Sequence, residues 1–476
     1  MTAAAGLRGA AVTVAGLGVS GVPAARALHA LGARVTVVNG AADDRARSEA
    51  AELEALGVAV RLGDGATLPG GTDLVVTSPG WRPDSPLFAA AAERGVEVWG
   101  DVELAWRLRG PGAAPWLAVT GTNGKTTTTR MLAAILTAAG LRTAAVGNIG
   151  VSLLDAVLGE QEYDVLAVEL SSYQLHWAPG IRPHSAAVLN LAPDHLDWHG
   201  SMAGYAADKG RIYRGNQVAC VYNTADPETE RLVREADVEE GCRAVGFTLG
   251  APRPSELGLV DGLLVDRAFV ADRQGTAQEL AETGDVRPSA PHNIANALAA
   301  AALARAFGVE PAAVREGLRA FRPDAHRIAE VATVDGVTWV DDSKATNTHA
   351  AQASLAAYDP VVWLAGGLAK GAAFDELTAR AADRLRAVVL FGADRALIRE
   401  ALARHAPQVP VVELERTDTG AMSDAVAAAR ELARPGDTVL LAPACASMDM
   451  FANYNQRGDL FAAAVRALPG TTAQAH

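Results

Sequence analysis

The sequence has few of the features that mark secreted or membrane-spanning proteins. It contains only three cysteines, at positions 220, 242 and 445, which are too few and too scattered for a disulfide framework or a zinc site. No uninterrupted apolar run approaches the ~18 residues that a spanning helix needs, and no basic segment followed by a long apolar core opens the chain. We therefore predict a soluble protein of the reducing cytoplasm.

Positive charge is scarce as well. The 42 Lys and Arg residues are outnumbered by 55 Asp and Glu residues, and the formal net charge is −13. Proteins that coat nucleic acid or an anionic membrane need basic surfaces, so we expect neither kind of partner. An anionic substrate would have to be held by local Lys and Arg side chains. At 476 residues, half of them hydrophobic, the chain is long enough for two or three domains.

A phosphate-binding loop is predicted at Thr120-Gly-Thr-Asn-Gly-Lys-Thr126, between an apolar run at 116–119 and an apolar-periodic segment at 129–139. In such a strand, loop and helix, backbone N–H groups point at the anion, Lys125 reaches the outer phosphates and the Thr126 hydroxyl can bind Mg²⁺. The loop is shorter than the general P-loop, which would have glycine in place of Val119. The alternative is a plain turn with a threonine cap, but the order of the elements favours a phosphate loop.

A second glycine loop, Gly16-Leu-Gly-Val-Ser-Gly21, follows an apolar strand at 10–14 and matches the dinucleotide-binding fingerprint. A nicotinamide site also needs an acid at the end of the next strand, where this chain has Asn39. The pyrophosphate of another nucleotide, such as a UDP-sugar, remains open. A further strand ends at Ser78-Pro-Gly80, which either lines this site or forms a plain turn, and the Gly/Pro-rich stretch 109–115 indicates a domain boundary.

Possible metal ligands follow the next strands. An apolar strand ends at Glu169, the layout of an acid that binds Mg²⁺ beside a phosphate loop. The following strand, 185–190, leads to His195, and a polar segment contains Lys209, which taken alone would be a solvated surface charge. At the start of an Ala-rich helix, Asn293 and Asn296 either cap the helix or contact an adenine.

The last part of the chain again alternates strands and helices. Strands are predicted at 337–340, 361–364, 387–390 and 438–441, which indicates a doubly wound sheet. Polar loops follow three of these strands, at 341–347, 365–371 and 442–449. Each could be a mere loop, but three together favour the rim of a substrate site.

With these motifs assembled, the chain resembles the Mur ligases from end to end. The strings that carry the resemblance in the last part are Asp342-Ser-Lys-Ala-Thr-Asn347, Leu441–Phe451 and Tyr454-Asn-Gln-Arg-Gly458. The string Asp-Asn-Pro-Arg, expected in members that add a diamino acid, is missing, which favours D-glutamate. The resemblance implies an ATP-dependent amide ligase that adds D-glutamate to UDP-N-acetylmuramoyl-L-alanine through an acyl phosphate, in the peptidoglycan synthesis on which cell shape and division depend.

The resemblance also implies an α/β fold of three domains. Residues 1–112 would form a Rossmann-like domain for the UDP substrate, 113–323 a central P-loop ATPase-type domain, and 324–476 a Rossmann-like domain for the amino acid. It further implies ATP and two Mg²⁺ ions, a monomer in the cytoplasm, and no nucleic-acid or membrane partner.

Carried over position by position, the resemblance implies roles for individual residues. The catalytic group would be Lys125, His195 and Lys209. The ATP site would contain Gly121, Thr122, Asn123, Gly124, Lys125, Thr126, Thr127, Asn293, Asn296, Arg327 and Asp342. The UDP substrate would contact Leu17, Ser20, Asn39, Gly80, Asn148 and His195. D-glutamate would contact Thr346, Lys370, Ser447 and Tyr454. The metal ligands would be Thr126, Glu169, His195 and Lys209. Lys209 would serve as a carbamate formed with CO₂, which offers the oxygen ligands that Mg²⁺ prefers.

Three other interpretations remain open. Another amide ligase of the superfamily, such as a folylpolyglutamate synthetase, would share the ATP loop but would not need the first domain. A non-catalytic ATP-binding regulator on the same fold would not need Lys125, Glu169, His195 and Lys209 together. A dehydrogenase is disfavoured by Asn39.

Overall fold

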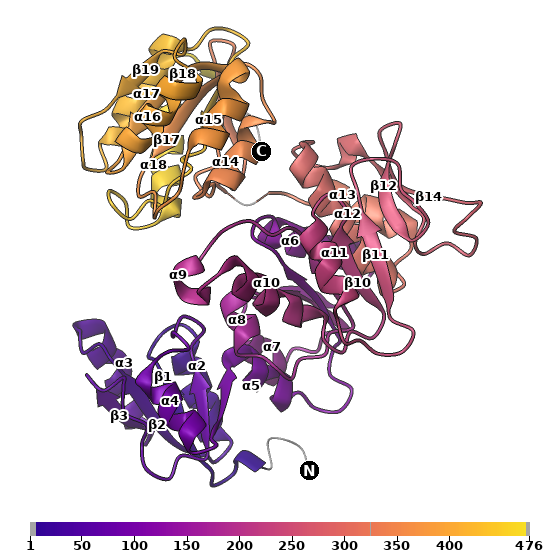
Figure 1. Cartoon of the computed structure of the whole chain (residues 1–476), viewed down its shortest axis with the longest axis vertical. Coiled ribbons are helices and arrows are strands. Elements are labelled where there is room, and N and C mark those ends of the chain that lie inside the picture. The colour runs from indigo at the N-terminus through magenta and orange to yellow at the C-terminus, as the bar shows by residue number, and fades with distance from the viewer. Residues whose placement is uncertain (1–5, 324, 473–476) are drawn as a thin grey trace. The chain divides into compact units, whose positions relative to one another are not determined.

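The computed structural model describes residues 6–323 and 325–472 and consists of two compact units. The first unit contains Met1–Ser289 and Asn293–Phe321, and the second contains Ala290–His292 and Arg322–His476. Helices alternate with the strands of three sheets, two in the first unit and one in the second (Figure 1). The predicted α/β class is thus confirmed. The three-domain division remains a prediction, and residue 324, its second boundary, lies outside the described residues.

The first sheet has five parallel strands in the order β3-β2-β1-β4-β5. The strands are Ala11–Ala15 (β1), Arg34–Asn39 (β2), Ala59–Leu62 (β3), Leu74–Thr77 (β4) and Glu97–Gly100 (β5), and the helices are Gly21–Ala30 (α2), Asp44–Ala55 (α3), Pro86–Glu93 (α4) and Asp101–Leu108 (α5). The strand order reverses between β1 and β4, because the chain first winds to one side of β1 and then to the other. Ligands of doubly wound sheets bind at such a switch point, which here holds the glycine loop after β1.

The second sheet has nine strands in the order β14-β13-β12-β11-β10-β9-β6-β8-β7. Its parallel strands are Trp116–Thr120 (β6), Thr143–Gly147 (β7), Val165–Glu169 (β8), Ser185–Val188 (β9), Ala219–Asn223 (β10), Arg243–Phe247 (β11) and Glu256–Val260 (β12), extended by the antiparallel Leu263–Asp266 (β13) and Gln278–Glu282 (β14). The central strands β6, β8 and β9 are buried along their whole length, as expected for apolar runs covered on both faces.

Helices surround this second sheet. They are Lys125–Ala138 (α6), Leu153–Leu158 (α7), Ser172–His176 (α8), Leu196–His199 (α9), Met202–Gly210 (α10), Pro227–Arg234 (α11), Pro291–Ala306 (α12) and Pro311–Ala320 (α13), with short 3₁₀ turns at Arg211–Tyr213 (η1) and Thr283–Asp285 (η2). α6, α12 and α13 share one hydrophobic core with β6 and its neighbours. Most side chains of the Ala-rich α12 are buried in this core.

The third sheet has seven strands in the order β19-β18-β17-β20-β16-β15-β21. The strands are Ala329–Val334 (β15), Val337–Asp341 (β16), Val361–Gly366 (β17), Leu385–Phe391 (β18), Val411–Glu413 (β19), Thr438–Leu441 (β20) and Thr471–Thr472 (β21). The helices are Thr348–Leu355 (α14), Asp375–Ala381 (α15), Arg395–His405 (α16), Ala421–Leu432 (α17) and Tyr454–Arg466 (α18), with a 3₁₀ turn at Ala382–Arg384 (η3). The sequence prediction missed the antiparallel β15, which pairs with β16 across the turn Asp335-Gly336, where both φ values are positive.

No helix among residues 6–323 and 325–472 is long and apolar enough to cross a membrane.

Candidate active site

The loop between β6 and α6 has the backbone that a phosphate-binding loop requires. Gly121 and Gly124 have φ values of 153° and 84°, in a region that favours glycine. A Cβ atom on Gly124 would lie 2.3 Å from Oδ1 of Asn296 on α12, so a side chain there would displace the Asn296 amide. The loop therefore depends on glycine both for its turn and for the close approach of the Asn296 side chain.

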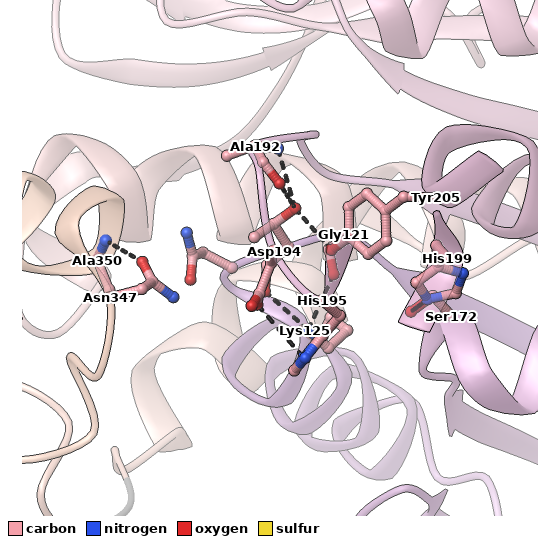
Figure 2. A network of polar contacts seen from close by, with 12 residues as sticks. Gly121, Lys125, Ser172, Ala192, Asp194, His195, His199, Tyr205, Asn347 and Ala350 are labelled. Carbon is pink, nitrogen blue, oxygen red and sulfur yellow. Dashed lines mark hydrogen bonds and ion pairs between the residues drawn. The ribbon is translucent and has the colours of Figure 1, made fainter. Parts of the chain in front are cut away.

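Lys125, the first residue of α6, folds back over this loop. Its ammonium donates a hydrogen bond to the carbonyl oxygen of Gly121 at 2.9 Å (Figure 2). It donates another to the carbonyl oxygen of Thr122 at 2.8 Å. Asn190, after β9, makes two hydrogen bonds with the loop. Its Oδ1 accepts from the Asn123 N–H at 2.9 Å, and its Nδ2 donates to the Asn123 carbonyl at 3.1 Å. The loop and its cation are thus held in place by the protein's own groups.

Glu169, the last residue of β8, is the strongest candidate for a metal ligand. The residue is 1% exposed, and its Oε1 accepts a hydrogen bond from Nδ2 of Asn148 at 2.9 Å. Its Oε2 is buried and has no hydrogen-bond partner among the described residues. A buried carboxylate oxygen without a partner is costly, and a hard cation such as Mg²⁺ would satisfy it. The predicted role of Glu169 therefore fits this structure.

Lys209, on α10, is buried and not a solvated surface charge. It is 1% exposed, and its ammonium donates to the Gly121 carbonyl at 2.8 Å and to Thr120 Oγ1 at 3.3 Å. Burial lowers the pKa of Lys209 well below its ordinary value; the charge of Lys125 lowers it further, and Asp194 and Glu169 act against this. The structure thus brings Lys209 to the phosphate loop and favours a neutral amine there.

His195 stands at the start of α9 with a left-handed backbone, φ 53°. Burial lowers the pKa of its imidazole; Lys125 and Lys209 lower it further, whereas Asp194 raises it. Nε2 of His195 lies 3.4 Å from Oδ2 of Asp194. The sequence analysis did not name Asp194, although an acid directly before His195 at a strand end is a signal that would have found it.

The described residues contain no group of three or more His, Cys, Asp or Glu side chains that could hold a metal ion. The predicted set explains this, because it contains one Glu and one His beside the Thr126 hydroxyl and Lys209. Such a site would depend on a modified lysine and on the phosphates of a bound nucleotide for its remaining oxygens.

Asn293 and Asn296 lie at the start of α12, next to the phosphate loop. Both are buried, and Nδ2 of Asn296 donates to Oδ1 of Asn293 at 3.3 Å. Nδ2 of Asn293 donates to the Pro288 carbonyl at 3.3 Å. The close approach of Asn296 to Gly124 ties this amide pair to the loop, and a contact with adenine remains a prediction.

A cavity of about 360 Å³ lies between the glycine loop of the first sheet and the loops after β7 and β8. Its lining residues are Val19, Ser20, Pro23, Pro79, Asp101, Gly147, Asn148, Ile149, Gly150, Ser152, Leu153, Leu154 and Gln174. Of the predicted contacts to the UDP substrate, it contains Ser20 and Asn148 but not Asn39, Gly80 or His195.

Leu17, another predicted contact of the UDP substrate, does not line this cavity. Its side chain is 5% exposed and belongs to the hydrophobic core, because it points inward from the loop after β1. Val19, two residues on, is 84% exposed and lines the cavity. Contact between Leu17 and the UDP substrate remains a prediction. The sequence analysis also missed Asp101, whose Oδ2 accepts from Ser20 Oγ at 2.7 Å and whose pKa is raised by burial.

The second unit holds the other predicted residues at the carboxyl edge of its sheet. Asp342, after β16, is 7% exposed, and burial raises its pKa to about 7; Ser354 donates a hydrogen bond to it, and Asp341 raises the pKa further. Ser447 is buried, whereas Lys370 is exposed and has a left-handed φ of 49°. Arg327 and Thr346 lie before β15 and after β16.

Arg457 on α18, which the sequence analysis missed, joins the loops of this edge. It is wholly buried and donates to the Ser343 hydroxyl and carbonyl at 3.0 and 2.8 Å and to the Cys445 carbonyl at 3.1 Å. Ser343 Oγ in turn donates to the Tyr454 carbonyl at 2.8 Å, and the Lys344 ammonium lies 3.8 Å from the centroid of the Tyr454 ring. Composition contained a signal for Lys344: the chain has only four lysines, at 125, 209, 344 and 370, and all four lie in these candidate sites.

The fold and the site define the class of protein. An α/β fold with a phosphate-type loop after β6 and the buried Glu169 at the end of β8 is that of a nucleotide-dependent enzyme. Residues 119–304 match the Mur ligase middle domain, and residues 326–445 match the Mur ligase glutamate ligase domain. The chain belongs to the Mur ligase family and is an ATP-dependent amide ligase.

Individual relatives agree with this assignment. The chain is 80% identical to the UDP-N-acetylmuramoylalanine--D-glutamate ligase of Streptomyces avermitilis, over 97% of this chain and 99% of that protein. It is 62% identical to the ligase of the same name from Thermobifida fusca, over 98% of this chain and all of that one. Among solved structures, UDP-N-acetylmuramate-alanine ligase from Thermotoga maritima is similar with a TM-score of 0.55 and 19% identity, over 96% of this chain and 99% of that one, which shows the fold alone.

Proposed function

We propose that this enzyme joins D-glutamate to UDP-N-acetylmuramoyl-L-alanine, with conversion of ATP to ADP and phosphate, in cytoplasmic peptidoglycan precursor synthesis. The observation that carries the proposal is the 80% identity, over nearly the whole chain, to a relative whose name states D-glutamate. The retained lysines and the buried acid of the candidate site support a catalytic role over a regulatory one.

The residues account for activation of a carboxylate, which by itself is a poor electrophile. A carboxylate oxygen of the L-alanine portion attacks the γ-phosphorus of ATP, and the bond from that phosphorus to the bridging oxygen breaks. The products are ADP and an acyl phosphate. Lys125, at the phosphate loop, offsets the negative charge on the transferred group, which in phosphoryl transfer is the main catalytic task of the protein. The amine of D-glutamate then attacks the carbonyl carbon, and loss of phosphate and a proton leaves the amide.

Lys209 has the chemistry required for a carbamate. A neutral amine can add to CO₂, whereas an ammonium cannot, and burial lowers the pKa of this lysine. Arginine could not serve here, because its guanidinium stays protonated. Thr126 and Glu169 would hold one Mg²⁺, and His195 with the Lys209 carbamate would hold a second; the ions would supply Lewis-acid stabilisation of the phosphoryl oxygens.

We propose three domains, at residues 1–112, 113–323 and 324–476. They would bind the UDP substrate, ATP and the amino acid, respectively. The cavity beside Ser20 and Asn148 supports a sugar-nucleotide site, since it offers backbone and amide donors next to a glycine loop. The loops joined by Arg457 support an amino-acid site in the last domain. We further propose a monomer.

Release of phosphate from ATP tests the proposal directly. Each UDP-muramoyl precursor and each amino acid should be supplied in turn, and only UDP-N-acetylmuramoyl-L-alanine with D-glutamate should give rapid release. Activity with a folate and L-glutamate would instead support a folylpolyglutamate synthetase. ATP binding without turnover on any pair would support a regulator.

Lys370 tests the amino-acid site. If its ammonium pairs with a carboxylate of D-glutamate, Lys370→Ala should raise the KM for D-glutamate by roughly 10- to 100-fold, the loss of one charge-assisted hydrogen bond. The KM values for ATP and the UDP substrate should stay close to those of the unchanged enzyme. Equal losses for all three substrates would contradict a role specific to D-glutamate.

A further inference from the structure

A buried polar cluster beside Lys209 has no role in the proposed chemistry. Asp208 of α10 accepts hydrogen bonds from two imidazoles: its two oxygens lie 3.0 Å from Nδ1 of His176, and Oδ2 lies 2.8 Å from Nδ1 of His199. Arg211 adds an ion pair to Oδ1 of Asp208 at 3.1 Å. Nε2 of His199 lies 3.0 Å from Oγ of Ser172, a pair that Figure 2 shows at the edge of the site.

The order Ser172, His199, Asp208 is that of a nucleophilic triad, but the cluster is closed. Ser172 is 2% exposed, and the side chain of His199 is 0% exposed. A nucleophilic serine needs a reacting carbonyl within about 3 Å, and no substrate can come that close to a hydroxyl buried in this way. The cluster therefore connects elements of the fold and carries out no reaction of its own.

The elements that it connects are those that carry the candidate ligands. Ser172 and His176 are on α8, which begins three residues after the end of β8 at Glu169. Asp208 directly precedes Lys209 on α10, and His199 ends the four-residue α9 that begins after His195. A helix as short as α9 has little stability of its own, so its position depends on contacts such as these.

Aromatic contacts support the same connection. The Tyr173 ring of α8 lies 4.9 Å from the His195 ring and 5.5 Å, stacked, from the His199 ring, measured between centroids. The Tyr205 ring of α10 lies 5.2 Å from His199, and its hydroxyl is 2.9 Å from Oγ1 of Thr122 in the phosphate loop. A continuous set of contacts thus runs from α8 through α9 and α10 to the phosphate loop.

We propose that Asp208 is a positioning residue that clamps α8 to α10 through His176 and His199 and so fixes the Lys209 amine beside the phosphate loop. This inference deepens the proposed function, because it rests on the role of Lys209 as a carbamate. Asp208 and Lys209 are adjacent on the helix and point in different directions, about 100° apart. The carboxylate is engaged by the clamp, while the amine faces Gly121.

The carbamate itself provides a readout separate from activity. The full-length enzyme, equilibrated with ¹³C-labelled bicarbonate, should give a carbamate signal in its ¹³C NMR spectrum, and Lys209→Ala should remove it. Asp208→Asn keeps the shape of the side chain but loses its charge. It should lower the signal about fivefold to tenfold, as expected when charge-assisted hydrogen bonds to the clamp are lost.

Asp285→Asn is the matched control. Asp285 is 7% exposed against 6% for Asp208, and it pairs with Arg315 at 2.9 Å and Arg319 at 2.6 Å, both on α13. Both variants should lower the unfolding temperature, but only Asp208→Asn should lower the carbamate signal. His199→Asn, which keeps a nitrogen where Nδ1 lies, should retain most of the signal. Full carbamate signal in Asp208→Asn would overturn the proposal.

A double-mutant cycle on ADP formation tests the clamp without the carbamate signal. If Asp208 acts through Lys209, Asp208→Asn should slow the unchanged enzyme about fivefold or more but have almost no effect in the Lys209→Ala background. Equal effects in both backgrounds would overturn the proposal. If the unchanged enzyme shows no carbamate signal, the proposed modification of Lys209 fails, and this cycle alone decides whether the clamp positions the lysine.

Discussion

Two glycine loops in this enzyme, after β1 and after β6, each connect a strand to a helix, but their neighbouring side chains carry opposite charges. The loop after β6 is covered by Lys125 and lies against the buried Lys209. The loop after β1 has no basic residue, and its Ser20 hydroxyl donates to the carboxyl of Asp101. Both depend on the close approach of a neighbouring group to glycine, since a Cβ on Gly21 would lie 2.0 Å from the Gly16 carbonyl oxygen and one on Gly124 would lie 2.3 Å from the Asn296 side chain.

The difference shows that a glycine loop provides backbone N–H groups, whereas neighbouring side chains decide which charge it can serve. A loop that takes part in phosphoryl transfer must offset charge that develops during the reaction, so it needs cations. A loop that only holds a nucleotide can rely on backbone donors and shape. The absence of a basic residue from the first loop fits a binding role, and the lysines of the second fit a catalytic one.

The largest effect is expected from removing the cation of the second loop. Lys125→Ala should lower the rate of phosphoryl transfer by about 100- to 1,000-fold, because the charge that offsets the transferred phosphoryl group is lost. The rate of ADP formation at saturating substrates measures it. Near-normal turnover in a correctly folded variant would remove the difference between the two loops.

The second lysine of this loop should have a somewhat smaller effect. Lys209→Ala should bind ATP normally but transfer its phosphoryl group about 100-fold more slowly, since an anionic ligand of the site is lost. A small added carboxylate, such as acetate or formate, should partly restore the rate by occupying the vacated space. Lys209→Arg should be as slow as Lys209→Ala, because a guanidinium forms no carbamate. It should not respond to added carboxylate, because the arginine side chain leaves no vacated space. Full activity of Lys209→Ala without added carboxylate would contradict the proposed role.

Substitutions in the loop after β1 should change the KM for the UDP substrate and not kcat. Gly21→Ala would place a methyl group against the Gly16 carbonyl and should raise the KM for the UDP substrate about tenfold, the size expected for overpacking by about 1–3 kcal/mol. Gly18→Ala is the control, because a Cβ there would meet nothing within 4 Å. The KM for ATP should be unchanged in both. A loss of kcat in Gly21→Ala with an unchanged KM would assign this loop to catalysis.

The smallest effect concerns Asp101. Burial raises its folded pKa above the ordinary value of about 4, so the folded protein holds this proton more tightly than the unfolded chain. The contribution of Asp101 to stability is therefore present at low pH and is lost as pH rises through the folded pKa. From about pH 4, the ordinary pKa of Asp, to about pH 8, the unfolding temperature of Asp101→Asn should rise by on the order of 2 °C relative to that of the unchanged enzyme. A constant difference across this range would show that Asp101 has no raised pKa.

The motifs that depend on neighbours in the chain were predicted well from the sequence. The strand, loop and helix around Lys125, and the acid at the end of β8, follow from local patterns of apolar residues and glycine. The antiparallel strands β13, β14 and β15 were not predicted, because their pairing depends on register with strands already in the sheet and not on a pattern of their own. The burial of Leu17 and the exposure of Val19 were not predicted either, since a loop residue carries no periodicity that tells inside from outside.

The sequence by itself determined the class of the fold, the two glycine loops and the positions of the four lysines. Arginine could not replace all of these lysines, because a guanidinium stays protonated. Only the tertiary structure decided which of these groups meet. Lys209 follows Lys125 by 84 positions, yet both ammonium groups donate to the Gly121 carbonyl. Burial lowers the pKa of Lys209, and the charge of Lys125 lowers it further. Burial and charge proximity are properties of packed elements far apart in the chain, so no local pattern of residues specifies them.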